Sequence, residues 1–177
     1  MDISKEKFLQ NIYDTVKEWE IKIGYRPEAV QLYYPEESLT ELLNVTEEEL
    51  PRAISEFKEQ VQASLGEIHI CETKEKGRYC VQISEKGTAY IHENVPEPAF
   101  LKAFLSVITS PGKTLEDVEA VFGQFSEKFT INKTENREWS FWFPDGGPDP
   151  YVYHVEEDDF GLQYHRFTKE AYNSLFL

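Results

Sequence analysis

Hydrophobic and polar residues alternate along the chain from Glu67 to Asn94, a period of two that is typical of β-strands. Gly77 and Gly87 interrupt the alternation, and glycines in short polar segments between such runs favour turns. The pattern therefore predicts an antiparallel three-stranded meander, with strands at Glu67–Thr73, Arg78–Ser84 and Thr88–Asn94.

One register keeps the apolar residues of this meander on a single face, and a slip of one residue would turn half of them into water. In that register Ser84 pairs with Thr88, Cys71 lies opposite Cys80, and Cys80 lies opposite His92. The second face is then expected to carry one row with Cys71, Cys80 and His92 and a neighbouring row with His69, Gln82 and Tyr90.

Cysteine and histidine are the ligand types that zinc prefers, so Cys71, Cys80, His92 and His69 are the candidate metal ligands. A flat row places its outer members about two strand spacings of roughly 4.8 Å apart, too far for one tetrahedral ion. We therefore expect no metal and no cofactor. Directly opposed cysteines permit a Cys71–Cys80 disulfide, but free thiols that pack as small hydrophobic side chains are favoured.

Apolar residues at helical spacing predict helices on both sides of this stretch. A capping box of Thr46 and Glu49 marks the start of one helix, and Thr114 caps another. Val30–Tyr34 is expected to be a short extended piece. The helices are expected at Ser4–Ile23, Pro35–Leu43, from Thr46 to Leu65, Ala99–Thr109, from Thr114 to Phe125, and after Thr168.

The last third of the chain predicts a second meander of four strands. Its aromatic residues share one face if Ile131 pairs with Phe141, Phe141 with Tyr153, and Tyr153 with Leu162. The strands are expected at Lys128–Lys133, Glu138–Phe143, Tyr151–Val155 and Phe160–Phe167. The solvent side of this sheet would then align Asn132, Ser140, His154 and Gly161 in one row.

Ser140 opposite His154 has the residue types of a nucleophile and its general base, and Asn132 could donate to an oxyanion. Ser140 lacks the Gly-x-Ser-x-Gly turn of α/β-hydrolases, and the register supplies no carboxylate to orient His154. A solvated polar row is the default interpretation. Ser140 and His154 remain the candidate catalytic residues of a small hydrolase.

Helices followed by antiparallel strands occur in both halves of the chain, so we expect an α+β fold with helices packed on antiparallel β-meanders. The three-stranded meander belongs to the first half and the four-stranded meander to the second. A chain of 177 residues that is 40% apolar can form a single compact unit over residues 1–177. Subdomains at 1–95 and 96–177 are the alternative.

The formal net charge of −15 disfavours direct nucleic-acid binding, because an acidic surface repels phosphates. It leaves a protein partner, contacted through an aromatic or acidic surface, as the expected class of partner. No run of about 18 apolar residues is present, so no membrane span is expected. The first residues lack the apolar core of a signal peptide, which indicates a cytoplasmic location.

The order helix, helix, helix, hairpin in the first half is that of winged helices, and Val81–Tyr90 resembles the wing of bacterial winged-helix regulators. The helix Arg52–Leu65, which would enter the DNA groove, balances its cations with carboxylates, so the resemblance implies contact with protein instead.

A second resemblance extends over essentially the whole chain, and the residues that carry it lie in both halves. They are Gly24–Arg26, Gln31–Leu39, Arg78–Cys80, Glu85–Gly87, Tyr90–Glu93 and Tyr164–Thr168. Together these segments resemble an uncharacterised bacterial domain-of-unknown-function family. This resemblance implies a stand-alone bacterial domain and assigns no catalytic residue.

These features together predict a non-enzymatic, cytoplasmic binding or accessory module that contacts another protein. The alternatives are a small hydrolase that uses Ser140 and His154, or a regulator of winged-helix ancestry. An exposed flat patch with Tyr33, Tyr34 or Trp142 would favour binding.

Overall fold

The computed structural model describes all residues from 1 to 177, and the chain divides into two compact units, Met1–Pro96 and Glu97–Leu177. Each unit combines α-helices with one antiparallel sheet. The α+β fold class is therefore confirmed, with a three-stranded sheet in the first unit and a four-stranded sheet in the second.

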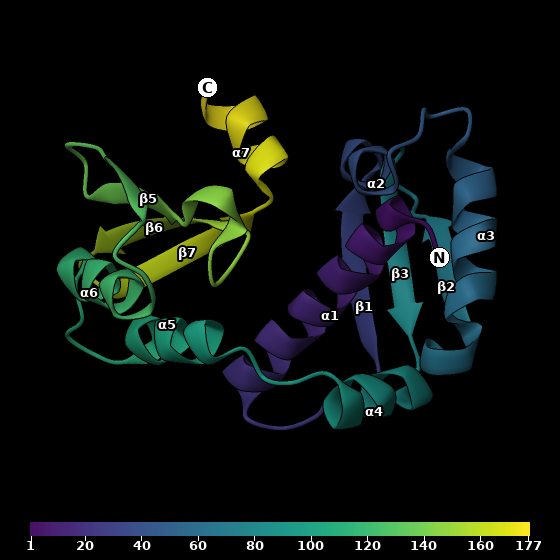
Figure 1. Cartoon of the computed structure of the whole chain (residues 1–177), viewed down its shortest axis with the longest axis horizontal. Helices are drawn as coiled ribbons and strands as arrows, with labels where there is room; N and C mark the ends of the chain where they lie inside the picture. The colour runs from purple at the N-terminus through teal and green to yellow at the C-terminus, as the bar shows by residue number, and fades with distance from the viewer. The chain divides into compact units, whose positions relative to one another are not determined.

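The first unit has one sheet in which β3 lies between β1 and β2, and both pairings are antiparallel (Figure 1). Its elements are α1 (Ile3–Ile23), β1 (Val30–Pro35), α2 (Glu36–Leu43), α3 (Leu50–Leu65), β2 (Ile68–Glu72), β3 (Arg78–Ile83) and α4 (Glu85–Asn94). The extended piece predicted at Val30–Tyr34 is thus a full member of the sheet.

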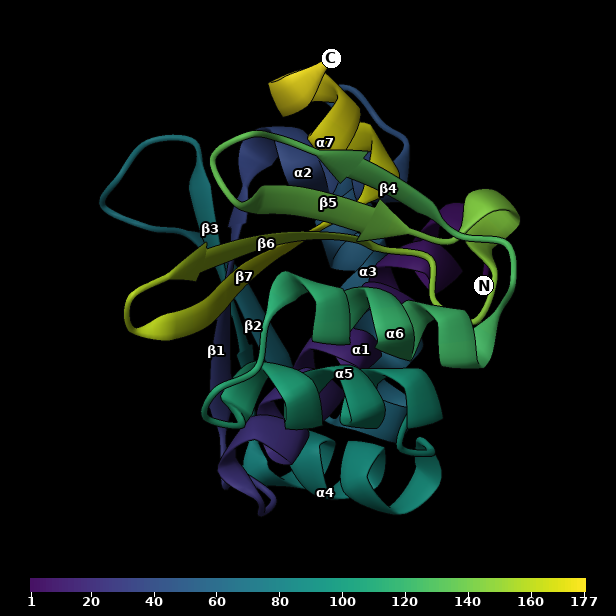
Figure 2. The same cartoon turned by 90° about the vertical axis from the view of Figure 1, so that its left-hand side faces the viewer.

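Helices α1, α2 and α3 all lie on one side of this sheet, as the view in Figure 2 shows. The strands alternate, so their apolar side chains point toward those helices and are buried, and these are Val30, Leu32, Tyr34, Ile68, Val81 and Ile83. The ring of Phe8 from α1 packs 4.5 Å from Phe57 of α3 and 5.5 Å from Tyr34 of β1, measured between centroids. The opposite side of the sheet has none of these helices on it.

The prediction of a strand at Thr88–Asn94 is wrong, because these residues belong to helix α4. Cys71 does lie opposite Cys80, as predicted, but the other neighbour of Cys80 is Tyr33 of β1 and not His92. The predicted pairing of Ser84 with Thr88 is also wrong. Ser84 instead occupies the N-cap position of α4, and buried Gly87, Thr88 and Ile91 face inward at helical spacing.

Gly87 is a close-packing residue and not the turn residue that the alternation predicts. A Cβ atom on Gly87 would lie 2.5 Å from Cγ2 of Ile83 and 2.9 Å from the carbonyl oxygen of Leu65. No side chain fits there, so glycine lets α4 approach the ends of α3 and β3. Thr88 Oγ1 joins α4 to the segment before β1, because it donates to the carbonyl oxygen of Glu28 at 2.9 Å. The hairpin on which the winged-helix resemblance depends is therefore absent.

The second unit has one sheet whose strands follow their sequence order, β4-β5-β6-β7. Figures 1 and 2 show α5 and α6 on one side of this sheet and α7 on the other. The elements are α5 (Ala99–Thr109), α6 (Leu115–Phe125), β4 (Thr130–Lys133), β5 (Glu138–Trp142), a 3-10 turn at Pro144–Gly146, β6 (Val152–Asp158), β7 (Gly161–Phe167) and α7 (Lys169–Phe176). All four predicted strands are present.

An aromatic core lies between this sheet and the helices α5 and α6. Phe122 stacks on Phe141 at 5.2 Å, and Phe104 packs 4.5 Å from Tyr153. The predicted pairs of Ile131 with Phe141 and of Phe141 with Tyr153 are both found. Phe141 and Tyr153 are fully buried, so the inner face of the sheet is as predicted.

The predicted register between the last two strands is wrong. Tyr153 pairs with Arg166 and not with Leu162, and His154 pairs with His165 and not with Gly161. Strand β6 continues to Asp158, which pairs with Gly161 across a tight turn. Phe160 lies in that turn and is 96% exposed, so it is not part of the aromatic core.

None of the helices combines the length and the apolar character that crossing a membrane requires.

Candidate functional site

A set of polar and aromatic side chains lies on the uncovered face of the β1-β3-β2 sheet, which we call the open face. The register aligns these side chains in rows across the three strands. One row holds Gln31, Gln82 and His69, the next holds Tyr33, Cys80 and Cys71, and a third begins with Pro35 and Arg78. The Thr73 N–H donates to the Arg78 carbonyl oxygen at 2.7 Å and extends that third row.

Tyr33 is the most prominent aromatic residue of the open face and is 50% exposed. Its hydroxyl donates to Oε1 of Gln31 at 3.0 Å, and the Arg78 guanidinium lies 4.6 Å from its ring centroid. A ring that is held from two sides keeps one orientation in water, which lowers the entropy lost on binding.

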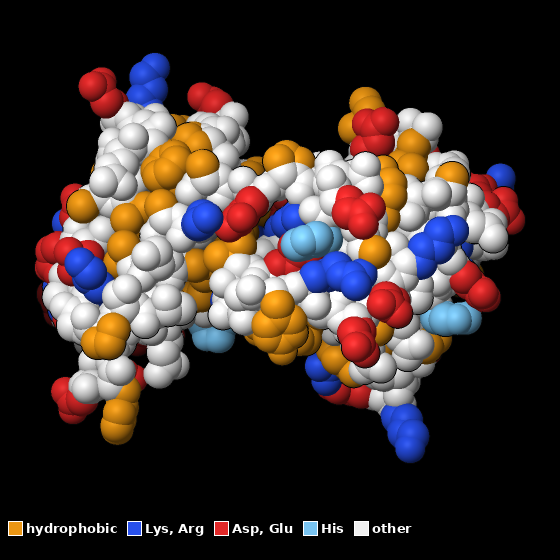
Figure 3. All heavy atoms as spheres, turned by 90° about the horizontal axis from the view of Figure 1, so that it is seen from below, with side chains coloured by type: hydrophobic (Ala, Val, Ile, Leu, Met, Phe, Trp, Pro, Cys, Tyr) orange, Lys and Arg blue, Asp and Glu red, His pale blue; other side chains and the backbone are white.

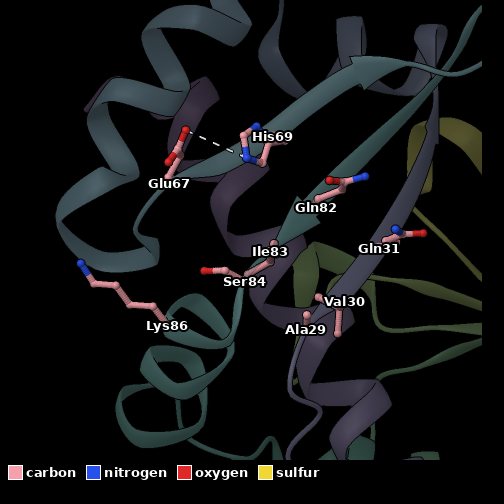
Figure 4. A pocket seen from close by; sticks show the side chains of 9 residues that line it. All are labelled: Ala29, Val30, Gln31, Glu67, His69, Gln82, Ile83, Ser84 and Lys86. Atoms are coloured by element: carbon pink, nitrogen blue, oxygen red, sulfur yellow. Dashed lines mark ion pairs between the residues drawn. The ribbon is translucent and has the colours of Figure 1, made fainter.

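A hollow of about 660 Å³ lies at the α4 end of the open face (Figure 4). Figure 4 shows that His69, Gln82 and Gln31 come from three neighbouring strands, while the side chain of Lys86, in the first turn of α4, extends away from them. The residues that line the hollow are Ala29, Val30, Gln31, Glu67, His69, Gln82, Ile83, Ser84 and Lys86.

The polar groups of the hollow have few partners within the protein. Lys86 forms no ion pair, and the side chains of Gln82 and Ser84 form no hydrogen bond. Glu67 is the only carboxylate that lines the hollow, and its Oε1 lies 4.0 Å from Nε2 of His69. The side chains of Gln82 and Ser84 are therefore available to a ligand with hydrogen-bonding atoms.

The candidate metal ligands predicted from the sequence are only partly brought together. Cys71 and Cys80 lie opposite each other as free thiols, Cys71 exposed and Cys80 buried, and His69 lies in the adjacent row. His92 is elsewhere, on α4. No group of three or more His, Cys, Asp or Glu side chains is placed to hold a metal ion.

His92 takes part in a different cluster, between α1 and α4. Its Nδ1 lies 3.3 Å from Oε2 of Glu20, and the same oxygen lies 3.1 Å from Nζ of Lys17. The side chains of Lys17 and Glu20 are only 5% and 9% exposed, so this ion pair is buried. The cluster joins the two helices and gives His92 a structural contact.

Ser140 and His154 are adjacent as predicted, with Oγ 2.9 Å from Nδ1, and Oε1 of Glu156 lies 3.7 Å from Nε2 of His154. This geometry has the order of a hydroxyl, an imidazole and a carboxylate. However, the residues Ser140 and His154 are 4% and 8% exposed, because α7 covers the face for which solvation is predicted. The ring of Phe176 packs 5.1 Å from the His154 ring.

Asn132 also lacks the freedom that an oxyanion donor requires. Its Nδ2 donates to the hydroxyl of Tyr172 on α7 at 3.4 Å. Tyr172 is itself buried, so this contact belongs to the packing of α7 on the sheet. Ser140 and His154 therefore form a covered polar pair, and the exposed Asn132 lies at its edge.

Sequence reasoning misses Gln31, Ser84 and Lys86 as members of one site. The predicted extended piece gives Gln31 no partner strand, and the predicted hairpin takes Ser84 and Lys86 away from it. One signal is present, since Val30, Leu32 and Tyr34 alternate with Gln31 and Tyr33 as they would on a strand that is buried on one face.

Comparison with known proteins gives one finding about the whole chain. Neither the curated proteins nor the solved structures include a match to it. A family model described as a domain of unknown function, E. rectale gene description (DUF3877), matches residues 5–176, which confirms the resemblance inferred from the sequence. The chain therefore belongs to this uncharacterised domain family.

Proposed function

We propose that this protein is a non-enzymatic binding module of the bacterial cytoplasm, and that it holds an extended acidic segment of another protein on the open face. The observation that carries the proposal is the distribution of charge. The chain contains 33 aspartates and glutamates, yet Glu67 is the only carboxylate among the side chains that line the hollow of this face.

Cationic groups stand at both ends of the open face. Arg78, whose Nη1 lies 3.2 Å from Oε2 of Glu75, begins β3, and Lys86 follows its far end. Arg78 and Ser84 are six residues apart in sequence, which is about 20 Å at roughly 3.4 Å per residue, so an extended segment of about six residues would match the length of β3. Figure 3, which views the surface from below, shows Lys, Arg and His side chains interspersed with Asp and Glu side chains.

Between the cations, the face offers contacts that suit a peptide. Gln31 and Gln82 carry amides that can donate and accept hydrogen bonds, and Tyr33 supplies a half-exposed aromatic ring. Aromatic residues and arginine are the side chains that most often dominate the binding energy of protein interfaces. β1 and β2 are also the outer strands of the sheet, so a bound segment has backbone edges close by.

The hydrolase alternative has less support. A serine nucleophile must reach its substrate, and α7 packs over Ser140 and His154.

The proposed cytoplasmic location is supported by the two free thiols, which are too few for a disulfide scaffold.

A displayed library of random peptides tests the proposed function, because the protein itself selects the sequences that it binds. The full chain is immobilised, and the enriched peptides are then measured individually by calorimetry against the parent chain and two variants. Tyr33→Ser removes the aromatic ring of the open face. Phe160→Ser is the matched control, because Phe160 is a 96% exposed aromatic residue in the second unit.

We expect the enriched peptides to be rich in Asp and Glu, and we expect Tyr33→Ser to weaken their binding by at least about tenfold. Phe160→Ser should leave it unchanged. Enrichment of neutral or basic peptides, or equal binding to the parent chain and Tyr33→Ser, would contradict the proposal.

A further inference from the structure

The two cysteines of the chain are neighbours on the open face. Cys71 of β2 pairs directly with Cys80 of β3, and both are free thiols. Directly paired residues of an antiparallel sheet point their side chains to the same face. Because the sequence contains only these two cysteines, each thiol has the other as its one partner for a disulfide within the chain.

The hydrogen-bond pattern of β2 and β3 sets the backbone spacing at this pair. The Thr73 N–H donates to the carbonyl oxygen of Arg78 at 2.7 Å. Hydrogen-bonded and non-hydrogen-bonded pairs alternate along an antiparallel ladder, so Cys71 and Cys80, two residues further along each strand, form a hydrogen-bonded pair as well. The Cα atoms of such a pair lie about 5.5 Å apart, and disulfides most often join Cα atoms about 5.5–6 Å apart. A disulfide can therefore form here while the strand register is kept.

The spacing of the Cβ atoms is less favourable for the bond. In directly opposed pairs the Cβ atoms lie about 4.5–5.5 Å apart, with hydrogen-bonded pairs at the wider end. A disulfide holds them about 3.5–4.5 Å apart. Closing the bond must draw the two Cβ atoms together, and a disulfide that stores strain in this way is reduced more easily. A bond between Cys71 and Cys80 is therefore expected to be reversible.

The two thiols differ in their access to solvent. Cys71, on the outer strand β2, is exposed, whereas Cys80 is only 6% exposed. Cys80 lies on the central strand, between Tyr33 of β1 and Cys71 in the same row. A small reagent can therefore reach Cys71 directly, and Cys80 is placed to react next, from within the protein.

From this arrangement we infer that Cys71 and Cys80 are a reversible redox pair that reacts with small disulfides of the glutathione type. The Cys71 thiolate attacks one sulfur of the small disulfide, whose S–S bond breaks, and one small thiolate leaves. The Cys80 thiolate then attacks the sulfur of Cys71, and the second small thiolate leaves. The two protein thiols lose two electrons and two protons in total, and the small disulfide becomes two thiols.

This inference goes beyond the proposed function, because the reaction requires no protein partner. Disulfides that form in reducing compartments are usually transient and serve catalysis or redox sensing. The new bond would tie the outer strand β2 to the central strand β3 within the row that also contains Tyr33. Oxidation would thereby change the covalent structure of the open face.

Oxidised glutathione is the probe that tests the redox pair. The reduced full chain, freed of reductant, is incubated with it, and the intact mass is followed over time. We expect a short-lived adduct of one glutathione and then a species that lacks two hydrogen atoms, in which peptide mapping finds Cys71 joined to Cys80. An excess of reduced glutathione should restore the starting mass.

Two variants with one cysteine each test the order of the steps. Cys80→Ala should retain glutathione on Cys71, because no second thiol displaces it. Cys71→Ser should react at least about tenfold more slowly than Cys80→Ala, because its remaining thiol is buried. Urea midpoints show whether both variants are folded, and the time course and peptide map of the parent chain need no variant.

Four results would overturn the inference. They are a mixed disulfide of the parent chain that never resolves, disulfides only between two chains, a Cys71–Cys80 bond that resists excess reduced glutathione, and equal reaction rates of the two folded variants.

The outcome is separable from that of the peptide experiment. If acidic peptides depend on Tyr33 while Cys71 and Cys80 do not form a reversible bond, the inference fails and the proposed function stands. If the bond forms and is reduced as expected while no acidic peptide depends on Tyr33, the inference stands and the proposed function fails.

Discussion

Oγ of Ser140 lies 2.9 Å from Nδ1 of His154, and both side chains are buried beneath α7. Removal of this hydroxyl leaves a buried ring nitrogen without its partner. We therefore expect Ser140→Ala to lower the free energy of unfolding by about 1–3 kcal/mol, measured as a shift of the urea midpoint. Ser174→Ala, at an exposed serine of α7, should change it by less than about 0.5 kcal/mol.

Phe141 lies on the other face of β5, and its truncation gives a reference for the loss of unfolding free energy when a core side chain is removed. Its side chain is fully buried and stacks on Phe122, so Phe141→Ala should cost about 3–5 kcal/mol. A midpoint for Ser140→Ala equal to that of the parent chain would show that α7 leaves this face accessible to water.

Two glycines within helices should respond in opposite directions to alanine. Gly87→Ala in α4 places a Cβ atom 2.5 Å from Ile83, and overpacking of this kind costs about 1–3 kcal/mol. At Gly123 in α6 the nearest atom would be 3.8 Å away, so Gly123→Ala should stabilise by up to about 1 kcal/mol through helix propensity. Urea midpoints that move in the same direction for both variants would contradict the packing of α4.

Both guanidinium nitrogens Nη1 and Nη2 of Arg137 donate to the Glu116 carboxylate, at 2.8 and 2.9 Å. These hydrogen bonds lower the pKa of Glu116 from 4.5 to about 2. A lowered folded-state pKa stabilises the protein above pH 4.5, and this contribution disappears as the pH falls from 4.5 toward 2. Because Glu116 is 57% exposed, solvent screening limits the contribution to less than about 1 kcal/mol.

We therefore expect Glu116→Gln to be less stable than the parent chain at pH 6, and the difference to vanish near pH 2. Urea unfolding at both pH values measures it. Glu127→Gln, at an exposed glutamate, is the control and should show no such trend. A stability difference that is the same at both pH values would rule out ionisation of Glu116 as its cause.

The buried ion pair of Lys17 and Glu20 should show strong coupling. Oε1 of Glu20 is buried without a hydrogen-bond partner, so Lys17→Met would leave a poorly compensated charge and cost about 3–5 kcal/mol. The double variant Lys17→Met/Glu20→Gln removes both charges and should be more stable than Lys17→Met alone. A double-mutant cycle in urea measures the coupling, and simple additivity would contradict it.

Duplex DNA should not bind to this protein at physiological salt. The net charge of −15 opposes contact with phosphates, and the segment that resembles a wing forms part of β3 and α4. A mobility shift assay with random duplexes tests this expectation. Salt-sensitive binding at micromolar concentration or below would contradict it.

The sequence predicts most elements correctly because amphipathic periodicity decides them. The buried stripe of Phe8, Ile12 and Val16 fixes α1, and the pairing of Phe141 with Tyr153 fixes the aromatic face of the second sheet. Alternation could not distinguish a third strand from α4, because the decisive feature is the space at Gly87 between Ile83 and Leu65. That space exists only in the assembled unit.

The candidate site was predictable only in part, for the same reason. The pairing of Cys71 with Cys80 and of Ser140 with His154 follows from local strand registers. Which face is exposed depends on distant elements: β1 completes the open face, and α7 covers Ser140. Periodicity within a strand gives two faces but does not tell which of them another helix will cover.

The central position of β3 has a consequence for the order of assembly. β3 pairs with β1, from which α2, α3 and β2 separate it along the chain, whereas every strand of the second sheet pairs with its neighbour in sequence. During synthesis, Val30–Pro35 therefore remains without a partner strand until Arg78–Ile83 has emerged. Non-local pairing of this kind slows folding, so the half of the protein that is made first is the one whose sheet must wait longer to close.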